Sequence, residues 1–134
     1  MTSTHSVFTY GTLQIPEVMQ LVVGVDFQSS PATLNGYQRF KIKNKTYPGI
    51  IRNPNKTIEG ILYSGLSDHA LVLLDQFEDI LYERCLVDIK NEAQQAFVYV
   101  IKDEYKHLMA DEPWSLAEFE KKYLEKYLRD INSW

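Results

Sequence analysis

A single glutamate is the residue whose spacing most directly suggests chemistry. Glu78 follows Leu71 by seven positions and Leu74 by four, so it falls on the apolar face of the predicted helix if that helix continues far enough. A carboxylate on an inward face loses hydration, which raises its pKa towards neutrality. Such a group can accept and return protons near pH 7. The alternative is that the helix ends at Phe77 and leaves Glu78 in solvent.

The second candidate is a turn after the first predicted strand, made of Tyr10, Gly11, Thr12 and Leu13. Backbone N–H groups just beyond a strand have no ladder partner, and successive ones can form a concave anion site. Gly11 would permit a positive φ and the close approach of a ligand. The alternative is a plain connection to a helix beginning at Pro16, with the glycine needed for geometry alone.

Polar side chains on two later segments form the third candidate group. Tyr82 and Arg84 share one face of a predicted strand, and Tyr99 lies on a strand expected to pair with it. The tyrosine hydroxyls would bind a polar ligand or make structural hydrogen bonds, and the sequence leaves both open. Arg84 would pair with Glu78 or lie on the surface. Asp75 lies near the same helical arc as Glu78.

Metal and cofactor chemistry find no support in the residue inventory. The three histidines and the single cysteine match no zinc spacing: His5, His69, His107 and Cys85. No phosphate-loop or dinucleotide-binding glycine pattern is present. Cys85 alternates with Val87 and Ile89, which predicts a buried apolar role. We therefore expect no metal and no organic cofactor.

Length and composition favour a single domain spanning residues 1–134. The chain is 45% hydrophobic, which is enough for one core. Its net charge of −4 gives no support to binding nucleic acid. The nearest approach to a basic cluster is the alternation of Lys41, Lys43 and Lys45, which is typical of a solvated or edge-protecting strand face.

The sequence also favours a cytoplasmic location. One cysteine excludes an internal disulfide and suits a reducing compartment. No apolar run reaches the length of a membrane span, and the polar N-terminus does not resemble a signal peptide. Whether the protein is a monomer or a weak homodimer stays open.

The predicted elements are about six strands and three helices in mixed order, which favours an α+β fold on a curled or closed mixed sheet. Asn35-Gly36 is typical of a hairpin turn, and Asn53–Asn55 and Asn91–Ala93 mark further turns. Ser67 and Ser115 are predicted to cap helices. The last helix carries apolar and aromatic residues at helical spacing, for which packing is expected: Leu116, Phe119, Tyr123, Tyr127 and Ile131.

The order of these features resembles a known family. Val7–Leu13 is similar to its N-terminal signature, a hydrophobic strand ending in Tyr-Gly-Thr/Ser-Leu/Asn. The block Leu74–Glu78, followed by Tyr82–Arg84, resembles the family's Leu-Asp-x-Phe-Glu…Tyr-x-Arg pattern, which contains the catalytic glutamate. Between and after these, four shorter segments fall in the family's order: Leu34–Tyr37, Tyr47–Gly49, Ile58–Tyr63 and Ala96–Tyr99.

This pattern is that of the gamma-glutamylcyclotransferase-like superfamily. The chain most resembles its short branch, which includes gamma-glutamylamine cyclotransferases and plant avirulence-induced proteins. The resemblance implies a small mixed β-barrel of about six strands flanked by helices. It also implies an enzyme that cyclises a gamma-glutamyl group, releasing 5-oxoproline and a free amine or amino acid, with Glu78 as general acid/base.

The resemblance further implies the substrate site of this small-molecule enzyme. The expected binding residues are Tyr10, Gly11, Thr12, Leu13, Pro48, Gly49, Tyr82 and Tyr99. Asp79 and the short apolar spacer Ile80-Leu81 depart from the family's pattern, which leaves the choice of leaving group open. The alternative from another class is a module that binds a small molecule in the same cavity without turnover.

Overall fold

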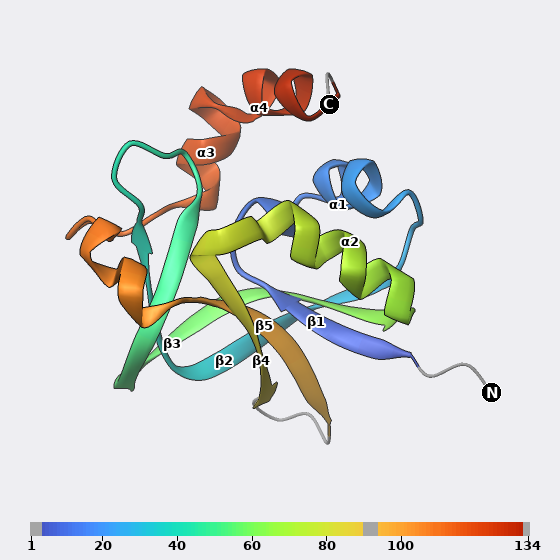
Figure 1. Cartoon of the computed structure of the whole chain (residues 1–134), viewed down its shortest axis with the longest axis horizontal. Helices are drawn as coiled ribbons and strands as arrows, with labels where there is room; N and C mark the ends of the chain where they lie inside the picture. The colour runs from blue at the N-terminus through green and yellow to red at the C-terminus, as the bar shows by residue number, and fades with distance from the viewer. Residues whose placement is uncertain (1–3, 90–93, 133–134) are drawn as a thin grey trace.

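A five-stranded mixed sheet forms the centre of the molecule. The computed structural model describes residues 4–89 and 94–132. The strands are ordered β2-β3-β1-β5-β4 across the sheet, with β1 antiparallel to β3 and parallel to β5 (Figure 1). Their bounds are β1 His5–Thr9, β2 Gln28–Lys41, β3 Pro48–Leu66, β4 Tyr82–Asp88 and β5 Gln95–Ile101. The predicted turn at Asn91–Ala93 lies outside the described residues.

The first two helices begin near the residues that the sequence signals predict, but the single last helix that was predicted is wrong, because it is interrupted at Tyr123 and forms two helices. The helix bounds are α1 Pro16–Val23, α2 Asp68–Glu78, α3 Leu116–Lys122 and α4 Leu124–Asn132, with short 3₁₀ turns η1 Thr12–Gln14, η2 Asp79–Leu81 and η3 Asp103–Leu108. The Ser67 hydroxyl accepts a hydrogen bond from the Ala70 N–H at 3.1 Å, and the Ser115 hydroxyl accepts one from the Glu118 N–H at 3.3 Å. Both predicted N-caps are therefore confirmed.

The predicted hairpin turn at Asn35-Gly36 is wrong. Strand β2 continues through it, since Asn35 pairs with Thr57 and Tyr37 pairs with Arg52. Between these two pairs β2 has one residue, Gly36, whereas β3 has the four residues 53–56, which bulge from the ladder. The turn-forming residues at this point bend a strand instead of ending it, and β3 changes direction here in Figure 1.

The two long strands β2 and β3 explain the difference between the predicted and observed strand count. Each joins two segments that the sequence predicts as separate strands, so the sheet has five strands in the described residues. The α+β class with flanking helices is confirmed. The sheet is not closed into a barrel, because β2 and β4 are its two edges in this part of the chain.

Two apolar clusters occupy the two faces of the sheet. Alternation along β1 sends Val7 into one cluster and Phe8 into the other. The Val7 cluster lies against the helices and includes Leu74 and Phe119. The Phe8 cluster is built from the strands, and half-buried Cys85 packs against it. Each fully buried large apolar side chain contributes roughly 1.5–3 kcal/mol, so both clusters hold the sheet in place.

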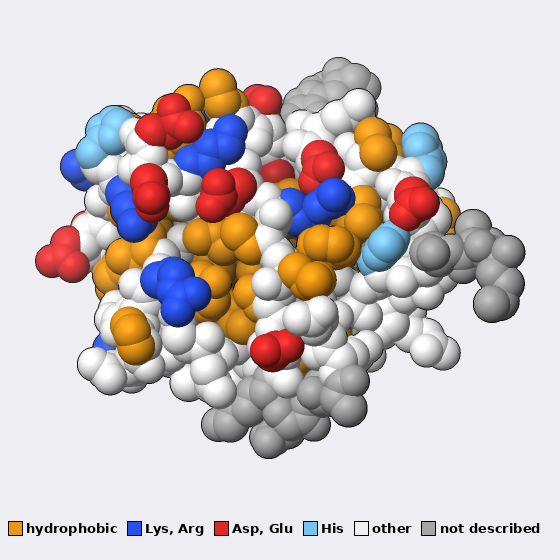
Figure 2. Space-filling model, turned by 60° about the horizontal axis from the view of Figure 1, so that its bottom comes forward, with side chains coloured by type: hydrophobic (Ala, Val, Ile, Leu, Met, Phe, Trp, Pro, Cys, Tyr) orange, Lys and Arg blue, Asp and Glu red, His pale blue; other side chains and the backbone are white. Residues whose placement is uncertain are grey.

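The helices cover the sheet unevenly. Helices α1 and α2 lie side by side over one face, and α4 contacts α1 (Figure 1). Another side of the molecule carries interspersed acidic and basic side chains around an area of hydrophobic ones (Figure 2). Among the described helices, none combines the length and the apolar character that crossing a membrane requires.

Candidate active site

A cavity of about 690 Å³ lies where four segments meet. These are the turn after β1, the C-terminal end of α2 with η2, the loop between β2 and β3, and α4, and single residues of β5 and η3, Tyr99 and Leu108, also contribute to the lining. The residues predicted for the site line this cavity with one exception: Tyr10, Gly11, Thr12, Leu13, Pro48, Glu78, Tyr82 and Tyr99. The fold therefore brings together segments that are far apart in the sequence.

Glu78 is the last residue of α2. The helix continues past Phe77 and ends after Glu78, where Asp79 takes a positive φ of 63°. The predicted inward position of Glu78 is thus confirmed. Burial among protein atoms raises the pKa of the carboxyl to about 8. No hydrogen bond or ion pair to this carboxyl is found within residues 4–89 and 94–132, so a ligand can meet it directly.

The turn at Tyr10–Leu13 enters η1, and its first N–H groups have no acceptor inside that short helix. The expected positive φ at Gly11 is wrong, because its φ is −124°. The glycine is required by crowding instead. A Cβ at this position would lie 3.0 Å from both Cδ and Cγ of Pro48. Pro48 thereby fixes one side of the turn.

Hydrogen bonds to structural groups occupy the hydroxyls of the three predicted tyrosines. Tyr10 donates to the Tyr99 carbonyl at 2.6 Å, and Tyr82 donates to the Pro48 carbonyl at 2.7 Å. Tyr99 donates to Asp75 Oδ1 at 2.7 Å. Burial raises the pKa of Tyr10, Tyr82 and Tyr99. These side chains therefore form rigid, neutral walls around the cavity.

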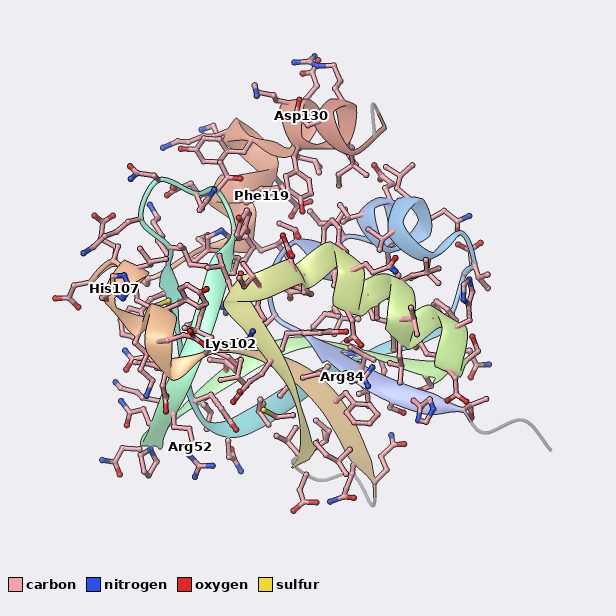
Figure 3. The ribbon with its side chains drawn as sticks, viewed as in Figure 1. Arg52, Arg84, Lys102, His107, Phe119 and Asp130 are labelled. Carbon is pink, nitrogen blue, oxygen red and sulfur yellow. The ribbon has the colours of Figure 1, made fainter. Side chains whose placement is uncertain are left out.

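Arg84 lies on the surface, which was one of the two alternatives, and it also makes an ion pair there. Its Nη1 lies 3.2 Å from Asp75 Oδ2, so it pairs with Asp75 and not with Glu78. The guanidinium also lies 4.7 Å from the centre of the Phe97 ring. Figure 3 shows Arg84 below α2, beside the strands β4 and β5. The predicted pairing of the two strands is confirmed, with Arg84 opposite Tyr99.

Comparisons with known proteins agree with this arrangement. Residues 7–116 match the family model described as Gamma-glutamyl cyclotransferase, AIG2-like. The chain belongs to this family. It is 33% identical to AIG2-like protein D from Arabidopsis thaliana, over 93% of this chain and 85% of that protein.

Two solved structures show the same fold. A protein from Arabidopsis thaliana, determined in solution, superposes with a TM-score of 0.74 and 28% identity over 99% of this chain and 82% of its own. A structure named gamma-glutamyl cyclotransferase superposes with a TM-score of 0.69 over 97% of this chain and 87% of its own, at 15% identity. The second likeness concerns the fold alone.

The gamma-glutamyl cyclotransferase, AIG2-like match includes every predicted site residue, but one of these does not reach the cavity. Gly49 is not among the residues that line the cavity, and a Cβ at this position would collide with the Ile101 side chain. Its role in the described structure is to let β3 pass close to β5. Pro48, its neighbour, is the residue of this pair that lines the cavity.

Tyr127 lines the cavity although the sequence predicts only packing for it. Its hydroxyl lies 3.1 Å from Thr12 Oγ1, and burial raises its pKa. The residue lies on α4, beyond the part of the chain that matches the family model. Helical spacing correctly placed it on an inward face. Nothing in the local sequence indicated that this face borders a cavity.

The prediction that Lys41, Lys43 and Lys45 alternate along one strand is wrong for two of them. Strand β2 ends at Lys41, whose Nζ lies 3.1 Å from Glu118 Oε1. Lys43 and Lys45 belong to the following loop and line the cavity, as does Asn44 with its φ of 64°. The predicted strand face therefore stops at Lys41.

Among the described residues, no group of three or more His, Cys, Asp or Glu is arranged to hold a metal ion.

Proposed function

We propose that this protein converts a gamma-glutamyl group into 5-oxoproline and releases the attached amine, with Glu78 as the acid/base. The observation that carries the proposal is the Glu78 carboxyl in the cavity, with its pKa raised by burial to about 8. The turn at Tyr10–Leu13 borders the same cavity. Membership of the gamma-glutamyl cyclotransferase, AIG2-like family supports the same chemistry.

The reaction joins two groups of one substrate molecule. The α-amine attacks the gamma-carbonyl carbon, a ring C–N bond forms, and the bond from that carbon to the leaving nitrogen breaks. One amine proton moves to Glu78 and then to the leaving nitrogen, so no net proton is gained or lost. Because both reacting groups are in one molecule, the cavity mainly has to hold the substrate in a closing conformation.

The raised pKa of Glu78 suits both proton transfers. An ordinary glutamate, with a pKa near 4.3, is a weak base towards an ammonium group. A carboxyl with a pKa of about 8 is close to an α-amine in proton affinity, so transfer between them costs little. The same protonated carboxyl then supplies a proton to the leaving nitrogen.

The turn after β1 provides the complementary binding element. A gamma-glutamyl group carries an α-carboxylate, and the N–H groups at the start of η1 suit an anion. Tyr82 and Tyr99 are held by hydrogen bonds to Pro48 and Asp75, so they shape the cavity without rearranging. The leaving group would extend towards the mouth, where Lys43, Lys45 and Asp79 offer charges of both signs.

The test is 5-oxoproline release from a panel of gamma-glutamyl compounds. The panel spans leaving groups that carry a carboxylate, no charge or an ammonium group. Wild type is compared with Glu78→Gln and with Glu120→Gln, an exposed change on α3. General acid–base catalysis contributes roughly 10²–10⁴-fold, so E78Q is expected to lose that much turnover while E120Q loses none.

Two results would overturn the proposal. E78Q with wild-type turnover would exclude Glu78 as the acid/base. Binding of panel members with none of them converted would instead favour a module that binds a small molecule without turnover. Mass spectrometry of the recovered ligand separates these cases, because cyclisation replaces the gamma-glutamyl compound by two products.

A further inference from the structure

Hydrogen bonds fix the directions of the carbonyl groups in the turn at Tyr10–Leu13. The carbonyls of Gly11 and Thr12 accept from the N–H groups of Gln14 and Ile15, each at 3.1 Å. The Leu13 carbonyl accepts from the Tyr63 hydroxyl at 2.9 Å. The orientation of the peptide groups after these carbonyls is therefore set by neutral donors, two of them within the turn itself.

The Tyr10 carbonyl is held differently, by a charged side chain from another strand. Arg39 on β2 donates from Nη1 to this oxygen at 2.6 Å and to the Glu59 carbonyl at 3.2 Å. Strand β1 ends at Thr9, so the Tyr10 carbonyl lies beyond that strand. A bond from an ionised donor is about twice as strong as a neutral one. Arg39 is thus the main restraint on this peptide group.

Peptide geometry converts that restraint into a direction for the next N–H. The described chain contains no cis peptide bond, and in a trans peptide the C=O and N–H point in opposite directions. Arg39 lines a second hollow together with Gln14 and Glu59, and it does not line the cavity of Glu78. Gly11 lines the Glu78 cavity. The Gly11 N–H therefore points away from Arg39, towards the side of Glu78.

Arg39 is itself anchored behind the turn. Its guanidinium lies 5.8 Å from the centre of the Trp114 ring, and the Trp114 Nε1–H donates to the Thr46 carbonyl at 2.8 Å. Glycine tolerates rotation of the Tyr10–Gly11 peptide far better than other residues do. Without the arginine, rotation of this peptide would turn the Gly11 N–H out of the cavity.

We propose that Arg39 is a positioning residue for the carboxylate of the ligand: it holds the Tyr10–Gly11 peptide so that the Gly11 N–H faces the cavity. The inference about Arg39 rests on the proposed function in one respect only, namely that the ligand is a gamma-glutamyl compound. The orienting role itself concerns any small carboxylate bound at the turn. Arg39 does not touch the substrate.

The first experiment measures carboxylate binding without turnover. 5-Oxoproline is titrated into ¹⁵N-labelled protein, and the Gly11 amide signal is followed by NMR. Arg39→Met keeps much of the apolar stem against Trp114 but removes the donor, and Arg52→Met is the matched control. Arg52 lies on β3 with its guanidinium 5.7 Å from the centre of the Tyr37 ring, and it does not line the cavity.

The expected result is a rise in the dissociation constant of about 10–100-fold for R39M and no change for R52M, since a hydrogen bond to a charged group contributes about 1.5–3 kcal/mol. Arg39→Lys, which keeps a charged donor, is expected to fall between wild type and R39M. An unchanged dissociation constant in R39M, or the absence of a ligand-induced shift at Gly11 in the wild type, would overturn the inference.

Steady-state kinetics then separate this inference from the proposed function. If the protein releases 5-oxoproline, R39M is expected to raise KM roughly tenfold or more and to change kcat much less. Turnover with an unchanged KM would remove the inference and leave the function intact. No turnover, together with weakened carboxylate binding in R39M, would remove the function and leave the inference intact. If R39M fails to fold, R39Q carries the same comparisons.

Discussion

Two carboxylates one helical turn apart on α2 have opposite surroundings. Asp75 is 44% exposed and is held by Arg84 at 3.2 Å and the Tyr99 hydroxyl at 2.7 Å. Glu78 borders the cavity, and within the described residues no hydrogen bond or ion pair to it is found. Burial raises the Glu78 pKa to about 8. The same chemical group is therefore a structural anchor at position 75 and, in the proposed reaction, the proton carrier at position 78.

The difference comes from what faces the helix and not from the helix itself. Three residues along an α-helix turn the side chain by about 300°, which leaves Asp75 and Glu78 about 60° apart around the axis. Strands β4 and β5 supply partners at the first position. The second lies where α2 ends and the polypeptide turns away through η2. A rotation of about 60° around the helix axis thus decides whether a carboxylate is paired, as in Asp75, or desolvated, as in Glu78.

The largest expected effect comes from moving the unpaired carboxyl. Glu78→Asp keeps the charge and withdraws the group by one methylene, roughly 1 Å. Misplacement of this size costs about 100-fold in rate, so kcat for 5-oxoproline release is expected to fall by that amount. Asp75→Glu is the matched change at the paired position, with an expected loss below tenfold. Equal losses in the two variants would contradict the distinction between them.

The pH dependence sharpens the comparison next. The reactive complex holds one proton shared by Glu78 and the substrate amine, so protonation of both groups stops the reaction. Well below the Glu78 pKa of about 8, kcat/KM is expected to fall about tenfold per pH unit, which amounts to about 50-fold from pH 8 to pH 6. Initial rates across pH 5–10 test this. A flat profile between pH 6 and 8 would show that Glu78 does not titrate there.

Stability gives an independent measure of the desolvated carboxyl. Its folded pKa of about 8 lies above the ordinary value, so the folded state holds the proton more tightly and stability falls as pH rises from about 4.5 to 8. Glu78→Gln removes this loss. Since each unit of pKa shift corresponds to about 1.4 kcal/mol, we expect E78Q to be more stable than wild type at pH 8.5 by roughly 4–5 kcal/mol, and nearly equal to it at pH 4.

Thermal unfolding at both pH values is the measurement for this prediction. Glu120→Gln on α3, an exposed residue that does not line the cavity, is the control and should show no such dependence on pH. A stabilisation of E78Q that is the same at both pH values would place its origin outside the ionisation of Glu78.

The smallest expected effect comes from neutralising the paired carboxylate. Asp75→Asn keeps an acceptor for the Tyr99 hydroxyl but loses the ion pair with Arg84. Desolvation is the cause of the raised Glu78 pKa, so the acidic limb of the pH profile should stay within about half a unit of wild type. A limb displaced by a full unit would mean that the charge at position 75, and not desolvation alone, sets the Glu78 pKa.

Local patterns placed Glu78 on the apolar face of a helix and a turn at Tyr10–Leu13, but they left open whether either belongs to a site, which only the family resemblance implied. The first depends on helical spacing within eight residues and the second on a strand followed by a glycine, and neither requires knowledge of the sheet. The caps at Ser67 and Ser115 are local in the same way. Such features follow from nearest-neighbour geometry, which a sequence displays directly.

The partners across the fold could not be predicted in this way. Arg84 meets Asp75, and Tyr127 meets Thr12 from 115 positions away, only because of how the elements pack. The residues around Asn53 have turn chemistry, yet pairing on both sides keeps β3 continuous. Long-range pairing overrode local preference at each of these places.

The indole of Trp114 also allows the loop between β2 and β3 and the side chain of Arg39 to be followed by fluorescence. It is buried, it hydrogen-bonds the Thr46 carbonyl in the loop between β2 and β3, and it lies beneath the guanidinium that holds the Tyr10 peptide. The chain has two tryptophans, and the other, Trp134, lies outside the described residues. Trp134→Phe would leave Trp114 as the single tryptophan, which can be excited apart from the nine tyrosines. Its emission responds to the charge over its ring, so it reports movement of the loop or of Arg39 without a chemical label.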